Sequence, residues 1–218
     1  MASHAHASIL ATRLHALSSR LVNQEYQSSV ALPASDPAQP NARYPTVYLL
    51  DANWYFGLVT DITRIMARCE TFPETLVVGI GYPLDEPLDD AFKQIWANRS
   101  RDLTPTVDHE EEREEQEYVQ RPITAGGAPH FLQFIREELI PFIDNEYRTD
   151  GQQRTLVGHS SSPGQSDTWL ALSSLGFSHG AGRVPHPRSR TRTSAPTTHP
   201  NTLSRLNTRS IQNDFFRF

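Results

Sequence analysis

Along the first 160 positions, short continuous runs of apolar residues alternate with stretches in which apolar residues recur every three or four positions. The continuous runs Thr46–Leu50, Leu76–Ile80 and Arg154–Val157 are typical of strands buried on both faces, as in a parallel sheet. A fourth strand is expected at Glu25–Leu32, because Pro33 then interrupts the run.

Two segments carry the spacing of amphipathic helices. The first extends from Leu58 to Cys69 and predicts a helix that buries the Cys69 thiol. The second extends from Ala128 to Tyr147, where Pro141 is expected to bend or end the helix. Strand, helix and strand in this order form a βαβ unit, so the fold class is predicted to be α/β, three-layered, with a mainly parallel sheet.

The connection between the second and third buried strands, residues 84–125, is polar and contains the acidic run Glu110–Glu115. Such a run is typical of a solvated helix or loop. No residues elsewhere in the sequence point to a converging set of metal ligands, so neither a metal nor another cofactor is expected.

Gly158-His159-Ser160 directly follows the last predicted strand. A buried strand, a sharp turn and a serine at the tip of the turn form the nucleophile elbow of serine hydrolases. The serine hydroxyl becomes nucleophilic when a histidine takes its proton and a carboxylate orients that histidine. Ser160 is therefore the candidate nucleophile.

The tetrahedral intermediate of such a reaction needs two backbone N–H donors. One is expected from Ser161, the residue after the nucleophile, and the other from the loop after an earlier strand, where Ala52 and Asn53 are the candidates. Ser162 stands where a second glycine is usual, and its small side chain fits there at some steric cost.

Several motifs occur along the chain in one order: Tyr44–Asp51, Val78–Tyr82, Arg101–Pro105, Gly126–Ala128, Phe131–Asp144 and Val157–Ser160. Over roughly residues 20–160, this set resembles the family of α/β-hydrolase esterases that includes siderophore (enterobactin-type) esterases and esterase D-like enzymes. The resemblance implies a partial α/β-hydrolase fold and a Ser-His-acid hydrolase of small-molecule esters, siderophore-like esters among them. It also implies that Arg101 lies near the site, where it either binds an anionic substrate or forms a salt bridge with a nearby acid.

The composition changes after Ser160: residues 1–160 carry a formal charge of −10, and residues 161–218 carry +5. Members of the resembled family carry the catalytic acid and histidine on later strands. The histidines and acids available here lie in a segment rich in Arg, Ser, Thr and Pro, and we expect them to be exposed to solvent: His179, His186, His199, Asp167 and Asp214. The chain is therefore expected to be truncated or frame-shifted after the elbow.

Three segments are predicted: an N-terminal extension (1–19), an incomplete α/β-hydrolase domain (20–177) and a disordered basic tail (178–218). The extension lacks acidic residues and would align Ile9, Leu10, Leu14 and Leu17 on one helical face. It is either an organelle transit segment or a disordered or docked extension. The single cysteine fits a reducing compartment, here the cytoplasm.

Three functions stay open. The chain is a serine carboxylic-ester hydrolase impaired by the missing histidine and acid, a catalytically inactive fragment, or a non-enzymatic binding protein that uses its basic tail on acidic partners. The net charge of −5 gives no reason to expect nucleic-acid binding. No run approaches the roughly 20 apolar residues that span a bilayer, so no membrane is expected as a partner.

Overall fold

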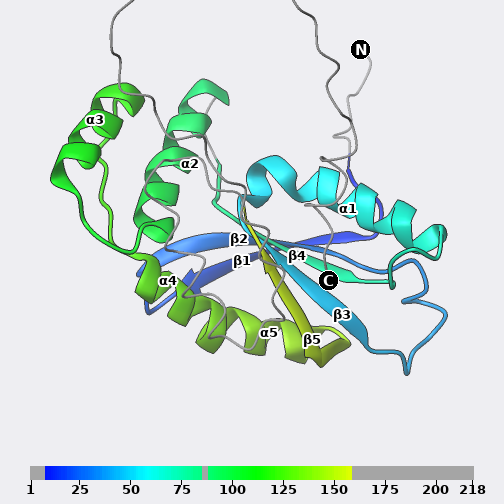
Figure 1. The fold of residues 1–218 in the computed structure, drawn as a ribbon. Helices are drawn as coiled ribbons and strands as arrows, with labels where there is room; N and C mark the ends of the chain where they lie inside the picture. Colours follow the sequence, from blue (N-terminus) through cyan, green and yellow to red (C-terminus); the bar gives the residue numbers. More distant parts are fainter. Residues whose placement is uncertain (1–7, 85–87, 159–218) are drawn as a thin grey trace, which may run out of the picture. The chain divides into compact units, whose positions relative to one another are not determined.

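A five-stranded sheet lies at the centre of the computed structural model, which describes residues 8–84 and 88–158 (Figure 1). The strands, in chain order, are β1 (Thr12–Ser19), β2 (Gln24–Ala31), β3 (Tyr44–Leu49), β4 (Leu76–Gly81) and β5 (Thr149–Val157). Their order in the sheet is β1-β2-β4-β3-β5. β3 is parallel to both β4 and β5, whereas β2 is antiparallel to both β1 and β4. Four strands thus run in one direction and β2 opposes them, which confirms the α/β class with a mainly parallel sheet.

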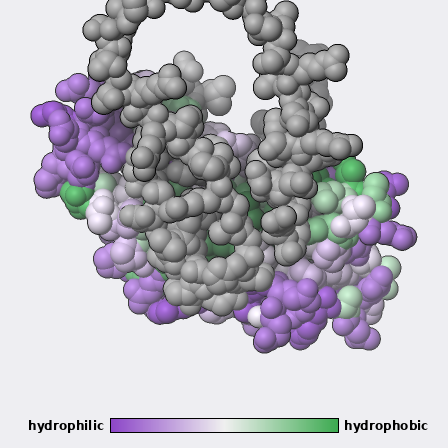
Figure 2. Space-filling view, viewed as in Figure 1, coloured by the Kyte–Doolittle hydropathy of each residue, from purple (hydrophilic) through white to green (hydrophobic). Residues whose placement is uncertain are grey.

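Helices cover both faces of this sheet (Figure 1). Their bounds are α1 (Ala52–Arg68), α2 (Leu88–Leu103), α3 (His109–Val119), α4 (Ala128–Phe134) and α5 (Ile140–Glu146), with a π-helical turn at Ile135–Leu139 between the last two. In Figure 1, α1 lies on one side of the strands, and α4 and α5 lie on the other. The acidic run Glu110–Glu115 lies in helix α3, as the prediction of a solvated helix or loop allowed. Figure 2 shows a hydrophilic surface over this helix.

β4 shows how the sheet divides the core, because alternate side chains of a strand point to opposite faces. Val78 belongs to the large cluster that includes Phe134 and Ile143 from the α4–α5 side. Val77 belongs to the smaller cluster with Ala52 and Phe56 of α1. The small residues of β4 on this second face allow α1 to come close to the sheet.

Gly79 is the clearest case of this close approach. A Cβ atom at position 79 would lie 2.7 Å from the Cβ of Ala52 and 2.8 Å from a ring carbon of Phe56. A larger residue would therefore push the first turn of α1 away from the strand. The glycine at position 79 thus allows the start of α1 to pack closely against the carboxyl end of β4.

The buried face of α1 differs from the predicted one. Ala52, Phe56 and Thr60 are its buried residues, whereas Leu58 and Ile65 are 59 % and 62 % exposed. Cys69 is also exposed, so the prediction of a buried thiol was wrong. The helix starts six residues earlier than its apolar pattern indicated, and the close packing of its first turn on β4 sets which side faces the core.

The N-terminal segment also differs from the expectation. Residues 12–19 form strand β1, which pairs with β2 along its whole length, from Thr12 opposite Ala31 to Ser19 opposite Gln24. They do not form the helical face that Leu14 and Leu17 suggested, because side chains of an edge strand alternate between two faces. In the structure this part of the predicted extension belongs to the sheet.

The helix predicted for residues 128–147 is present, but Pro141 does not end it. Proline lacks the N–H that a regular helix would use at that position. The π-helical turn just before it changes the hydrogen-bond spacing, and Pro141 occupies the first turn of α5.

The interpretation of residues 178–218 as a disordered tail lies outside the described residues. None of the helices in the described part of the chain has the length and apolar character of a membrane span.

Candidate active site

The carboxyl ends of β3 and β5 lie side by side. The amide of Leu50, just after β3, donates to the carbonyl of Val157, the last residue of β5, at 2.8 Å. The carboxyl edge of a parallel sheet is where α/β proteins bind their ligands. Gly158 is described, but Ser160 and Ser161 lie outside the described residues. The structure therefore shows where the chain enters the predicted elbow: beside the segment that follows β3.

That segment is the start of α1. Asp51 takes a left-handed backbone conformation (φ 56°, ψ 36°), and its carbonyl accepts from the amides of Trp54 and Tyr55 at 3.0 and 3.1 Å. The amides of Ala52 and Asn53 precede these two, and no described residue accepts a hydrogen bond from either of them. The first amides of a helix have no partner within the helix, and the helix dipole makes this end favourable for negative charge. The amides of Ala52 and Asn53 are therefore open to a negatively charged acceptor, and their role as oxyanion donors stays a prediction.

The side chain of Asn53 attaches this turn to the end of β4. Its Nδ2 donates to the carbonyl of Tyr82 at 2.9 Å, and its Oδ1 accepts from the amide of Tyr82 at 2.9 Å. Gly81 is needed for this approach, since a Cβ there would lie 2.7 Å from Oδ1 of Asn53. Asn53 was predicted only as a backbone amide donor, and the two hydrogen bonds of its side chain with the backbone of Tyr82 were not predicted.

A buried ion pair joins the same turn to α2. Arg99 Nε donates to Asp51 Oδ1 at 2.5 Å, and its second nitrogen donates to Asp51 Oδ2 at 3.1 Å. The two side chains are only 4 % and 2 % exposed. The Arg99 guanidinium also lies over the ring of Trp54, 5.8 Å from its centroid. Neither Arg99 nor the side chain of Asp51 carries a local signal in the sequence that would have marked this contact.

Arg101 forms the salt bridge that was one of its two predicted roles. Its Nε and a terminal nitrogen donate to the two carboxylate oxygens of Asp102 at 2.7 and 2.9 Å, and a third nitrogen donates to Asn98 at 3.0 Å. Asp102 is fully buried and also accepts from the hydroxyl of Tyr26 at 2.8 Å. Burial, reinforced by the Asp102 carboxylate, raises the pKa of Tyr26 far above its usual value. Substrate binding by Arg101 stays a prediction, and the described contacts occupy its guanidinium within the protein.

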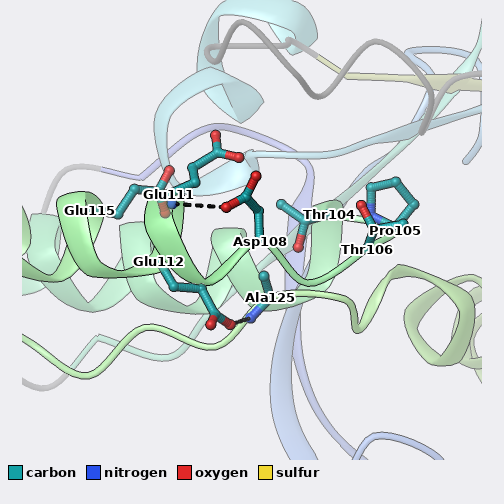
Figure 3. A pocket seen from close by; sticks show the side chains of 8 residues that line it. All are labelled: Thr104, Pro105, Thr106, Asp108, Glu111, Glu112, Glu115 and Ala125. Atoms are coloured by element: carbon teal, nitrogen blue, oxygen red, sulfur yellow. Dashed lines mark hydrogen bonds between the residues drawn. The ribbon is translucent and has the colours of Figure 1, made fainter.

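An acidic cavity of about 170 Å³ lies between the end of α2 and the start of α3 (Figure 3). Glu112 accepts from the Ala125 amide at 2.8 Å, and Glu115 accepts from Ser100 at 2.5 Å. Burial and the nearby carboxylates of Glu115 and Asp108 raise the pKa of Glu111. Within the described residues no group of side chains is arranged to hold a metal ion. The cavity would repel an anion and is not built like an ester site.

The comparison with known families decides the lineage. A family model described as "Putative esterase" matches residues 18–172, more than two thirds of the chain. The chain belongs to this esterase family. It is thus of serine ester hydrolase lineage, as the resemblance implied.

Two curated relatives of the chain carry siderophore names. It is 37 % identical over 158 residues to ferri-bacillibactin esterase BesA of Bacillus subtilis, a match that covers 68 % of this chain and 49 % of BesA. It is 33 % identical over 141 residues to a siderophore enterobactin esterase of Emericella nidulans, covering 58 % of this chain and 45 % of the relative. The chain thus spans about half the length of these relatives.

Solved structures agree with this fold. The BES protein from Bacillus cereus matches with a TM-score of 0.58 and 28 % identity, over 73 % of this chain and 55 % of the other. An IroE-like serine hydrolase from Shewanella oneidensis matches with a TM-score of 0.56 and 28 % identity, over 76 % and 48 %. The chain therefore shares the α/β architecture of these proteins over its described part.

Proposed function

We propose that the protein hydrolyses carboxylic esters through an acyl-enzyme on Ser160, and that its substrates are siderophore-type esters. The observation that carries the reaction is the junction of Leu50 with Val157, which brings the chain entering the elbow next to the start of α1. The substrate class is supported by the names of the two curated relatives.

In the proposed reaction, the hydroxyl oxygen of Ser160 attacks the ester carbonyl carbon while a base takes the hydroxyl proton. The negative charge that forms on the carbonyl oxygen is bound by backbone amides: Ser161 on one side, and Ala52 or Asn53 on the other. The alcohol leaves with a proton, and water then releases the acid from Ser160 in a second, equivalent step. Fixed amide donors lower the barrier because they are already oriented before the charge develops.

The base is the second requirement of this reaction, and among the described residues no histidine contacts the turn from Asp51 to Trp54. His15 bonds to the Tyr147 hydroxyl, and His109 bonds to Glu112 on α3. An unactivated serine reacts poorly, so the reactivity of Ser160 itself reports whether the chain supplies a base. This separates the hydrolase from the inactive fragment and from the non-enzymatic binding protein.

The experiment is labelling with a fluorophosphonate probe, which reacts covalently with activated serines. We expect one probe per wild-type molecule by intact mass, with Ser160 as the modified residue. Ser160→Ala should take up no probe, whereas the matched control Ser194→Ala, in the C-terminal segment, should be labelled as wild type is. Absence of labelling in the wild type, or equal labelling of Ser160→Ala, contradicts the proposal. The siderophore part is tested by hydrolysis of ferric enterobactin and ferric bacillibactin compared with a nitrophenyl ester.

A further inference from the structure

We propose that Arg99 is a positioning residue for the reaction: its buried ion pair with Asp51 fixes the turn that aims the amides of Ala52 and Asn53 at the oxyanion. This inference rests on the proposed function, since it assigns a role to a residue that does not touch the reacting atoms. It comes from the geometry at the start of α1, where two elements far apart in the sequence hold one turn.

The first argument is the backbone of Asp51. Its φ of 56° lies in the left-handed region, which is uncommon for residues other than glycine, although Asp and Asn enter it more readily than most. Asp51 is also the residue directly before the two amides of interest. A small rotation at Asp51 would therefore turn both amide vectors together.

The second argument is the kind of contact that holds Asp51. The side chain of Asp51 does not cap α1; both of its oxygens instead accept from Arg99. A guanidinium that binds both carboxylate oxygens fixes the orientation of the carboxylate as well as its distance. Because both groups are almost completely buried, water does not replace either partner. The ion pair thus restrains the residue whose backbone sets the amides.

The third argument is that the turn is held on both sides. Tyr82 holds Asn53 through two hydrogen bonds, and Arg99 holds Asp51 and lies over the ring of Trp54. Ala52 and Asn53 lie between these attachments, with amides that no described residue uses. A structure that keeps two amides fixed and without acceptors is what a preorganised oxyanion hole requires.

The test compares two variants with the wild type by the rate of fluorophosphonate labelling and by steady-state hydrolysis of a nitrophenyl ester. Arg99→Lys keeps the charge but not the two-point contact. We expect its labelling rate and kcat to fall about tenfold or more with little change in KM, because a misplacement on the order of 1 Å costs up to about 100-fold in rate. The double variant Asp51→Asn/Arg99→Gln removes both charges, so it leaves no unpaired buried charge, and asparagine tolerates the left-handed conformation. The double variant should fold and show the same fall in labelling rate and kcat as Arg99→Lys.

The matched control is Arg148→Lys. Arg148 also forms an ion pair with an aspartate, Asp36, but it lies just before the amino end of β5, at the opposite end of that strand from the site. We expect it to reduce thermal stability while the labelling rate per folded molecule stays at the wild-type value. A purely structural role for Arg99 would give the same pattern as Arg148.

The outcomes separate the two proposals. If the wild type is not labelled, the hydrolase function fails and the role of Arg99 fails with it. If the wild type is labelled and the folded Arg99 variants react at the wild-type rate, only the positioning role is overturned. If Arg99→Lys does not fold, the double variant decides. A loss confined to KM would also overturn the inference, because it would indicate substrate binding and not positioning of the amides.

Discussion

Raising the pH from 10 to 12 is expected to lower the free energy of unfolding by about 7 kcal/mol, because three buried tyrosines keep their protons in the folded chain. Tyr26 and Tyr48 are fully buried and Tyr82 is 5 % exposed. Burial is the main cause that raises the pKa of each, and the Asp102 carboxylate adds to it for Tyr26 and Tyr82. In the unfolded chain the same residues ionise near pH 10.

The direction of the change in stability with pH follows from the number of protons that the folded and unfolded states bind. Between pH 10 and the raised pKa values, the folded state holds more protons than the unfolded state, so stability falls as the pH rises. Each tyrosine contributes about 0.7 kcal/mol per pH unit at pH 10, where it is half ionised in the unfolded chain, and about 1.4 kcal/mol per pH unit well above pH 10. The total is comparable with the lower end of the stability range of typical domains, so a large loss of stability is expected by pH 12.

Urea unfolding followed by circular dichroism at several pH values, with tyrosinate absorbance recorded in parallel, measures this effect. Tyr82→Phe should reduce the slope by about one third, whereas Tyr118→Phe should leave it unchanged, since Tyr118 is 71 % exposed. A stability that does not change between pH 8 and 12, or equal slopes in both variants, would contradict the burial of these hydroxyls.

The second large effect is expected for Asp102→Ala, which should lower the free energy of unfolding by about 3–5 kcal/mol. Asp102 is fully buried and accepts from Arg101 with both oxygens and from the Tyr26 hydroxyl. The substitution leaves the Arg101 guanidinium without its carboxylate, so that, of its described hydrogen bonds, only the one to Asn98 remains, and it leaves the buried Tyr26 hydroxyl without its acceptor. In the folded variant the Tyr26 hydroxyl would stay out of contact with water without a hydrogen-bond acceptor, which costs the desolvation free energy of that group.

Urea titration at neutral pH measures the loss. The control on the same helix is Asp90→Ala, whose ion pair with Lys93 has an N–O distance of 3.6 Å and is half exposed. Exposed pairs of this kind contribute at most about 1 kcal/mol. Similar losses in the two variants would show that Asp102 is not the buried centre of a network.

Strands β3 and β4 could be predicted because both are largely buried on their two faces, whereas β5, which was also predicted to be buried, is largely half-buried or exposed. A strand buried on both faces has to be apolar at every position, which makes β3 and β4 visible as continuous runs. β1 is an edge strand with one exposed side, so its alternating pattern was confused with helical spacing. The buried face of α1 was missed because it depends on Gly79, which belongs to another element.

The candidate site was also predictable only in part. The position of Ser160 after strand β5, and of Ala52 and Asn53 after β3, follows from the order of elements and from the family's chemistry. The ion pair between Asp51 and Arg99 joins residues 48 positions apart, and α2 was not predicted because its polar sequence hides its buried residues. Long-range contacts between charged residues leave no local pattern in a sequence.

The central claim is that the hydroxyl of Ser160 stands at the carboxyl end of β5, facing the start of α1. A crystal structure of the phosphonylated protein tests this directly. We expect the phosphorus bonded to the Ser160 oxygen, with one phosphonyl oxygen about 2.7–3.1 Å from the amide nitrogens of Ser161 and of Ala52 or Asn53. An adduct on another residue, or a phosphonyl oxygen directed away from the start of α1, would contradict the account.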